Sequence, residues 1–138
     1  MGPYELIDHT ADIGVRAFGR TLEELFRNAA VGMFEIIAEL DSIGTLESRK
    51  IQLAAETLED LYLVWHQELL FRSSVDHVVY KEFSFDAISE KKLTAIIRGE
   101  KFNPEKQVLK KEIKAATYHE LKVQKTEEGW VGEVIFDI

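Results

Sequence analysis

The chain has 138 residues, of which 30% are charged, and its formal net charge is −8. The absence of cysteine excludes disulfides, zinc–thiolate sites and thiol nucleophiles. An acidic balance argues against nucleic-acid binding as the main activity, and we expect one cytoplasmic domain over residues 1–138 without membrane contact, because no apolar run approaches the roughly 20 residues that cross a bilayer.

The first third of the chain predicts two strands followed by a helix. Tyr4–Ile7 and Ile13–Gly19 read as strands on either side of a short polar break. Residues 21–24 (Thr-Leu-Glu-Glu) form a capping box, which is typical of a helix N-terminus. Apolar residues then recur every three or four positions to about residue 40, so we expect a helix with one core-facing side.

The rest of the chain predicts one more helix and several strands. Arg49–Ala54 reads as a strand, and Thr57 begins a second amphipathic helix. After this helix the apolar period changes to two, which predicts a hairpin that turns at Ser89–Lys91. The last two strands are expected at about residues 112–125 and 130–137. The predicted fold class is α+β, with two amphipathic helices packed on a mainly antiparallel β-sheet in a single compact domain.

Both ends of the chain carry carboxylates that a folded sheet could bring together. Residues 134–138 alternate like a half-buried strand, which would deliver the side chain of Asp137 and the terminal carboxylate of Ile138 to one spot. The polar break Asp8–Asp12 supplies two further carboxylates. Convergent oxygens of this kind suit a hard cation such as calcium or magnesium. Two simpler interpretations stay open: Asp12 caps a turn, and Asp137 forms a salt bridge.

The histidines suggest another class of chemistry. A metal-dependent hydrolase would activate a bound water, with His9 or His119 as general base or ligand. Both are also explained as hydrogen-bonded structural residues, and His77 suits the C-terminus of the second helix electrostatically. The sequence contains no glycine-rich phosphate loop and no nucleophile elbow. Residues 81–125 hold 11 basic against 7 acidic residues, which allows only a weak or indirect RNA contact.

Four motifs, taken in order along the chain, resemble the archease family. They are Asp8–Asp12 (DHTAD), Thr21–Phe26 (TLEELF), Lys114–His119 (KAATYH) and Val134–Ile138 (VIFDI). The resemblance covers nearly the whole chain. It departs from the family pattern at His66, which follows the tryptophan of the second helix, and in residues 103–107, where the family pattern has a histidine. The second departure leaves that loop without an assigned role.

The resemblance implies a small cytoplasmic protein that is not an enzyme but activates the tRNA-splicing RNA ligase. That ligase joins a 3′-phosphate or cyclic-phosphate RNA end to a 5′-hydroxyl, and the activator is expected to promote its guanylylation and repeated turnover. The resemblance also implies a divalent metal at Asp12, Asp137 and Ile138, with calcium expected before magnesium or manganese. An older view of the family implies a different partner, a tRNA methyltransferase, for which the chain would be a chaperone or modulator.

Overall fold

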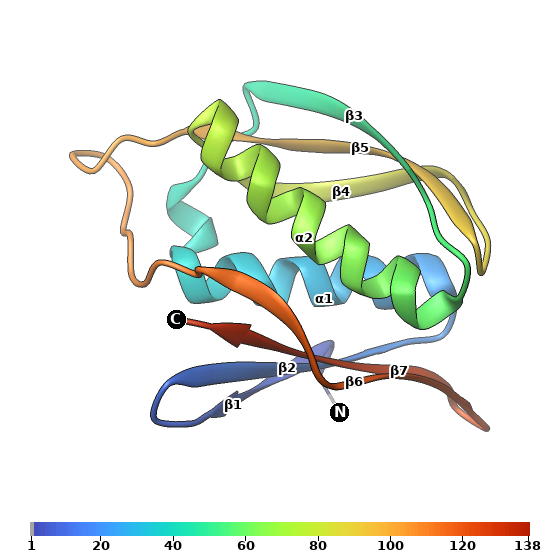
Figure 1. The fold of residues 1–138 in the computed structure, drawn as a ribbon. Coiled ribbons are helices and arrows are strands. Elements are labelled where there is room, and N and C mark those ends of the chain that lie inside the picture. Colours follow the sequence, from blue (N-terminus) through green and yellow to red (C-terminus); the bar gives the residue numbers. More distant parts are fainter. Residues whose placement is uncertain (1) are drawn as a thin grey trace.

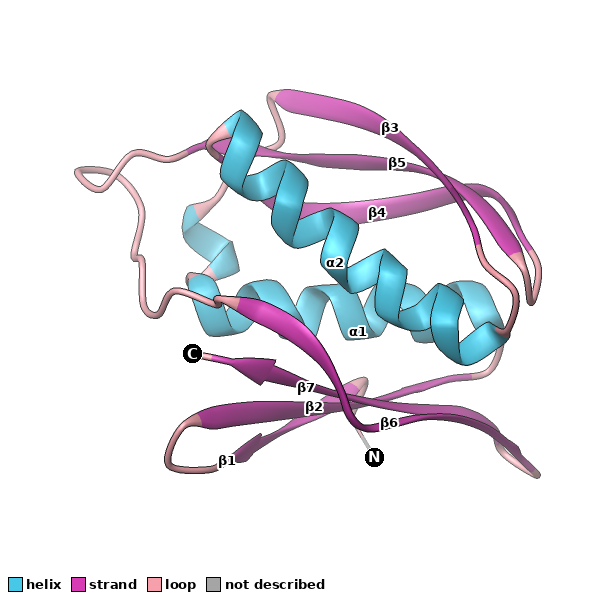
Figure 2. Cartoon of the chain, viewed as in Figure 1, coloured by secondary structure: helices cyan, strands magenta, loops and turns pink. Residues whose placement is uncertain are grey.

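The computed structural model describes residues 2–138 and contains two long helices and seven strands (Figure 1, Figure 2). In chain order the elements are β1 (Tyr4–Asp8), β2 (Asp12–Gly19), α1 (Leu22–Ile37), the 3-10 helix η1 (Leu40–Ser42), β3 (Glu47–Ala54), α2 (Leu58–Asp76), β4 (Val78–Ile88), β5 (Lys92–Lys101), β6 (Ala115–Thr126) and β7 (Gly129–Asp137). All strand pairs among these elements are antiparallel. The predicted α+β class, with two helices and antiparallel strands, is confirmed.

The strands form two sheets, where the sequence suggested one. One sheet has the order β1-β2-β7-β6 and the other has the order β3-β5-β4. Figure 1 shows α1 and α2 between the two sheets, and α1 contacts β2 of the first sheet and β4 of the second. No residue of α1 is exposed as a result. The prediction of one core-facing side is confirmed, because the buried residues of α1 are apolar or glycine, whereas its charged side chains are half-exposed. That buried side is wide enough to contact both sheets.

Both helices begin where the sequence places them. The hydroxyls of Thr21 and Thr57 each accept a hydrogen bond from the amide three residues later, at 3.1 Å in both cases, which satisfies one free amide of the first turn. The first helix ends at Ile37, about three residues earlier than predicted. Ala38 is already extended and forms an isolated bridge with Leu109, so a tertiary contact ends the helix.

A bulge interrupts the alternation expected in β4. The register of β4 against β5 shifts between Tyr80 and Glu82, which leaves Lys81 outside the regular pairing. The ammonium group of Lys81 donates to the carbonyl oxygens of Leu40 at 3.1 Å and Ile43 at 2.6 Å. Because of the bulge, Lys81 stabilises the connection between α1 and β3 through these two hydrogen bonds.

The strand β6 is also less regular than predicted. It begins at Ala115, about three residues later than expected, and its pairing with β7 is irregular between Thr117 and Lys122. Glu120 lies within this irregularity and has a positive φ of 52°. His119 lies beside Glu120 in this irregular part of β6 and is exposed.

One connected cluster of buried apolar side chains fills the space around the two helices, with Phe26, Trp65 and Phe136 among its fully buried members. This core draws on both sheets, which explains why neither sheet needs a second covering layer. Within residues 2–138, no helix has the length and apolar content needed to span a membrane.

Candidate functional site

The pairing of β2 with β7 brings the two predicted carboxylates face to face. Asp12 lies directly opposite Asp137 in the antiparallel register, and the next pair along the strands is Ile13 with Phe136. Ile13 and Phe136 are buried in the core, so the pleat directs Asp12 and Asp137 to the other face of the sheet. Directly opposite side chains have Cβ atoms about 4.5–5.5 Å apart in such pairs. The prediction that the two termini meet is confirmed.

Neither of the simpler interpretations accounts for these carboxylates. Asp12 shapes the β1–β2 turn through its backbone, because its carbonyl oxygen accepts from the amide of His9 at 3.0 Å. Its side-chain Oδ1 is buried and receives no hydrogen bond from residues 2–138. The ion pairs found among these residues include neither Asp12 nor Asp137. Two like charges therefore face each other, and one of them has a desolvated oxygen.

The arrangement is costly unless a cation completes it. A buried polar atom without a partner costs roughly 1–3 kcal/mol, and like charges directly opposite each other on a sheet destabilise it further. A divalent cation between the carboxylates would remove both costs, and carboxylate oxygens are the ligands that calcium and magnesium prefer. Asp12 and Asp137 therefore fit a metal by the chemistry of their donor atoms.

The end of the chain lies beside this pair. The amide of Ile138 donates to the carbonyl oxygen of Ala11 at 3.5 Å, and the carbonyl oxygen of Asp137 accepts from the amide of Lys114 at 2.8 Å. The side chain of Ile138 packs against the core, which fixes the position of its backbone next to the β1–β2 turn. We call the surface formed by Asp12, Asp137 and Ile138 the carboxylate tip.

The other candidates near the tip do not join it. Within residues 2–138, no three His, Asp or Glu side chains are close enough together to form a metal site. Asp8 ends β1 and His9 follows it; both are exposed, and neither forms such a group with Asp12 and Asp137. The chain offers the carboxylates of the tip at most, whereas calcium takes six to eight oxygen ligands in general. Most positions around a metal here would belong to water or to a partner.

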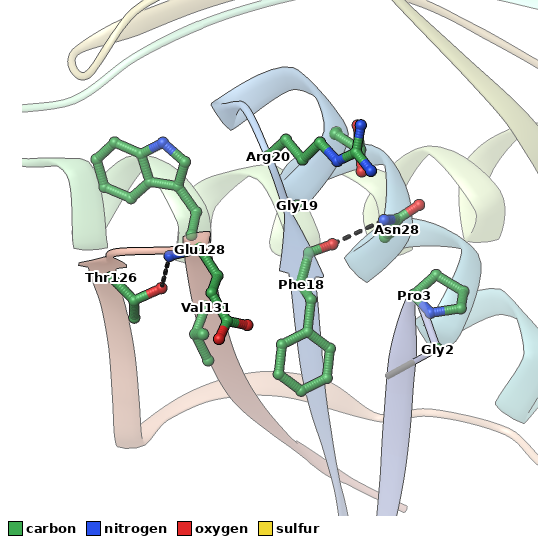
Figure 3. A pocket seen from close by; sticks show the side chains of 11 residues that line it. Gly2, Pro3, Phe18, Gly19, Arg20, Asn28, Thr126, Glu128 and Val131 are labelled. Carbon is green, nitrogen blue, oxygen red and sulfur yellow. Dashed lines mark hydrogen bonds between the residues drawn. The ribbon is translucent and has the colours of Figure 1, made fainter.

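A pocket of about 410 Å³ lies at the far end of the same strands (Figure 3). Gly19 of β2 and Trp130 of β7 pair at that end, seven residues along β2 from Asp12, which corresponds to roughly 23 Å. In Figure 3 the amide of Asn28 donates to the carbonyl oxygen of Phe18, at 2.7 Å. The pocket has no contact with the carboxylate tip, and the sequence motifs gave no sign of it.

Sequence reasoning also missed the buried polar pair of α2. The Tyr62 hydroxyl and His66 Nε2 are both buried without a hydrogen-bond partner in residues 2–138, and their rings are 4.8 Å apart between centroids. Burial is the main cause that lowers the pKa of His66 from 6.5 to about 4. This histidine is enclosed by the core, so it contributes to stability rather than to a surface site. The mixed polar and aromatic composition of residues 62–66 was the only signal in the sequence.

Comparison with known proteins supports the resemblance seen in the motifs. Residues 4–138 match the model of the archease protein family. The chain is 42% identical to the protein archease of Methanosarcina barkeri over 139 residues, covering 98% of this chain and 95% of that one. It is 35% identical to the protein archease of Pyrococcus abyssi over 142 residues, covering 100% of both chains.

Two solved structures share the fold. The solution structure of protein 1598 from Methanobacterium thermoautotrophicum matches with a TM-score of 0.84 and 30% identity, and the match covers 100% of both chains. The crystal structure of a protein from Thermotoga maritima, named as an archease and possible chaperone, matches with a TM-score of 0.68 and 24% identity over 96% of this chain and 94% of that one. The family model and the identities over full length show that this chain belongs to the archease family.

Proposed function

We propose that the chain binds a divalent cation at the carboxylate tip and uses this tip to activate a tRNA-splicing RNA ligase. Asp12, Asp137 and the terminal carboxylate of Ile138 would hold the cation, and calcium is the first candidate. The observation that carries the metal proposal is the buried, unpartnered Oδ1 of Asp12 directly opposite Asp137. Bound there, the cation would supply charge compensation and vacant coordination positions.

The activating role rests on family membership together with the openness of the tip. Asp137 is exposed and Asp12 is half-buried, so a partner can reach the pair directly. A ligase that handles RNA and nucleotides presents basic and metal-binding surfaces, which are complementary to a carboxylate tip. In this proposal the chain catalyses no reaction itself. It promotes guanylylation of the ligase and so allows the ligase to turn over repeatedly.

A chaperone or modulator of a tRNA methyltransferase is the second candidate. A chaperone-type activity is favoured by exposed apolar side chains, of which Phe71 and Val75 on α2 are 55% and 52% exposed. A metal-dependent hydrolase receives less support. His9 and His119 are both exposed, and neither belongs to a metal-binding group within residues 2–138.

Isothermal titration calorimetry tests the metal site. Asp12→Asn and Asp137→Asn each remove one carboxylate with little change in volume, so calcium binding should weaken at least tenfold in both variants. Asp86→Asn is the matched control, because Asp86 is an exposed aspartate in β4, away from the tip. Unchanged calcium affinity in both tip variants, with magnesium and manganese giving the same result, would exclude the site.

A multiple-turnover ligation assay tests the partner. The tRNA-splicing ligase is supplied with a 3′-phosphate RNA and excess RNA over enzyme, with and without the chain. Stimulation by the parent chain and the Asp86→Asn control, but by neither tip variant, is the expected result. Equal stimulation by the tip variants would remove the tip from the mechanism. A chain that stimulates only an added tRNA methyltransferase would favour the second candidate.

A further inference from the structure

A groove of about 390 Å³ separates the second half of α2 from the segment that precedes β6. Leu70, Ser73 and Ser74 of α2 line one wall, and residues 109–113 line the other. Phe102 contributes to the lining and is 40% exposed. Figure 1 shows the segment before β6 at the same end of the molecule as the carboxyl terminus. The walls thus come from parts of the chain that are distant in sequence.

The second wall is held in place by a buried polar network. Gln107 is 5% exposed, and its side-chain amide donates to the carbonyl oxygen of Lys101 at 2.7 Å and accepts from the amide of Asn103 at 2.9 Å. The backbone amide of Lys110 donates to the carbonyl oxygen of Ile37 at the end of α1, at 2.7 Å. The groove therefore exists before any ligand arrives, and binding would not have to order this wall.

Apolar side chains continue outward from the groove. Leu109 is 41% exposed in its wall and Val108 beside it is 47% exposed. Phe71 and Val75 of α2 are also more than half exposed, although neither lines the groove. Clusters of large exposed apolar side chains next to a preformed groove are characteristic of protein-binding surfaces. The groove can therefore accept apolar side chains of a partner.

The same wall offers hydrogen-bond donors, namely a lysine side chain without an ion pair to residues 2–138 and three backbone amides. Residues 106–114 hold four lysines and one glutamate, although the whole chain carries a net charge of −8. Lys110, Lys111 and Glu112 line the groove. The ammonium group of Lys110 already contacts the carboxylate of Glu35 at 3.5 Å, whereas Lys111 forms no ion pair with residues 2–138. In the same described range, the backbone amides of Lys111, Glu112 and Ile113 donate no hydrogen bond. A ligand that carries carboxylates can therefore pair with Lys111 and accept from these backbone amides.

We propose that this groove binds an acidic peptide segment of a partner protein. Apolar side chains of the segment would enter between Leu70 and Leu109. Its carboxylates would face Lys111 and would compete with Glu35 for Lys110. This site goes beyond the proposed function, because it needs neither a metal nor the ligase. The backbone contact between Lys114 and Asp137 places its wall beside the carboxylate tip, so one partner could occupy both surfaces.

Two other occupants fit less well. A second copy bound through a two-fold axis would bring the same lysine-bearing wall of both copies together, with repulsion between like charges. Single-stranded RNA would match the lysines but would leave the apolar walls without a partner. Charge complementarity therefore favours an acidic, apolar-anchored peptide.

NMR titration of the ¹⁵N-labelled chain tests the proposal with defined probes. The first probe is a 12-residue peptide of alternating leucine and glutamate, the second replaces each glutamate with lysine, and the third is oligouridine. The Leu/Glu peptide should shift the amide signals of residues 70–74 and 109–113 and should bind at least tenfold more tightly than the Leu/Lys peptide. The titrations contain EDTA, which keeps the result independent of the metal site.

Charge-reversal variants test whether the lysines of this wall bind the Leu/Glu peptide. Lys110→Glu/Lys111→Glu should weaken Leu/Glu binding at least tenfold, and Lys111→Glu alone, which breaks no recorded contact, should weaken it about threefold. Lys91→Glu/Lys92→Glu at the β4–β5 turn makes the same charge change elsewhere and should leave the affinity unchanged. Equal affinity for the two peptides, shifts confined to other residues, or binding of oligouridine alone would each overturn the proposal. Concentration-dependent line broadening without any probe would instead identify a second copy as the occupant and would also overturn it.

Discussion

His66 should make this protein lose stability under mildly acidic conditions. The side chain is fully buried in α2, and its Nδ1 donates to the carbonyl oxygen of Tyr62 at 2.8 Å. The proton is assigned to Nδ1 because a carbonyl oxygen can only accept. Nε2 then remains an acceptor without a partner in residues 2–138. Burial lowers the pKa of His66 from 6.5 to about 4, and nearby backbone groups of Tyr62 and Ala29 oppose the effect only in part.

The direction of the pH effect follows from proton uptake in the two states. As pH falls through 6.5 the unfolded chain protonates His66, whereas the folded chain does so only near pH 4. The stability that depends on neutral His66 is therefore complete above pH 6.5 and is lost as pH falls toward 4. Relative to pH 7, the loss amounts to about 2 kcal/mol at pH 5 and about 3 kcal/mol at pH 4. These losses are large beside a typical total of about 5–15 kcal/mol.

The most strongly shifted acidic side chain does not contribute to the loss of stability between pH 7 and pH 5. A hydrogen bond from Lys106, followed by one from the amide of Gly44, lowers the pKa of Glu100 from 4.5 to about 2. The stabilising contribution of Glu100 is present above pH 4.5 and is lost only as pH falls toward 2. The change between pH 7 and pH 5 can therefore be assigned to His66.

The loss of unfolding free energy can be measured by urea unfolding at pH 7, 6 and 5, with tryptophan fluorescence as the signal. Trp65 is buried in the folded state, so its fluorescence reports unfolding. His66→Leu keeps an apolar side chain against Tyr62 and Phe136 but removes the titrating group, so the loss between pH 7 and pH 5 should shrink by about 2 kcal/mol. His119→Gln changes an exposed histidine and should keep the full loss. The reasoning is refuted if the His66→Leu variant loses as much stability as the parent chain.

Two further predictions concern the strands of the first sheet. A few residues appended after Ile138 would move the terminal carboxylate away from the tip, so calcium affinity by calorimetry and stimulation in the ligation assay should fall together; full stimulation would show that this carboxylate has no role. Gly132→Ala should lower the free energy of unfolding by about 1–3 kcal/mol, because the new Cβ would lie 2.6 Å from the buried Tyr62 hydroxyl oxygen. Gly14→Ala is the control in urea unfolding, since its Cβ would meet Ile135 at an ordinary 3.7 Å; equal losses would argue against the clash.

The sequence predicted the features that depend on residues close together in the chain, such as helix starts. Thr21 and Thr57 mark the helix starts because a hydroxyl cap depends only on residues within one turn. The break expected between the last two strands also depends on local residues, and Gly129 adopts a φ of 132° there, which favours glycine. The meeting of Asp12 and Asp137 was predictable in part, because alternation in the last strand fixes which residues share a face.

The missed features all depend on contacts between distant residues. The division of the strands into two sheets places α1 in contact with β2 of one sheet and β4 of the other, and the apolar period of the helix does not show how many sheets its buried side contacts. The bulge at Lys81 follows from carbonyl oxygens that lie about 40 positions earlier in the chain. The groove beside α2 has one wall held by Gln107, whose burial no pattern in the sequence indicated.

The unpartnered oxygen of Asp12 predicts that the carboxylate tip lowers stability when no metal is bound. Asp12→Asn removes one of two opposed charges and lets the new amide donate to Asp137, so without metal the variant should be more stable than the parent by about 0.5–1 kcal/mol. Calcium at one hundred times the parent's Kd should stabilise the parent by about 2.7 kcal/mol and the variant by about 1.4 kcal/mol at most, since the variant binds it at least tenfold more weakly. The order of the two melting temperatures should therefore reverse between EDTA and calcium. Melting curves by circular dichroism measure both orders, and Asp86→Asn should follow the parent in each buffer. A variant that is less stable than the parent in EDTA would mean that Asp12 is satisfied within the chain, and the physical argument for a cation at the tip would then fail.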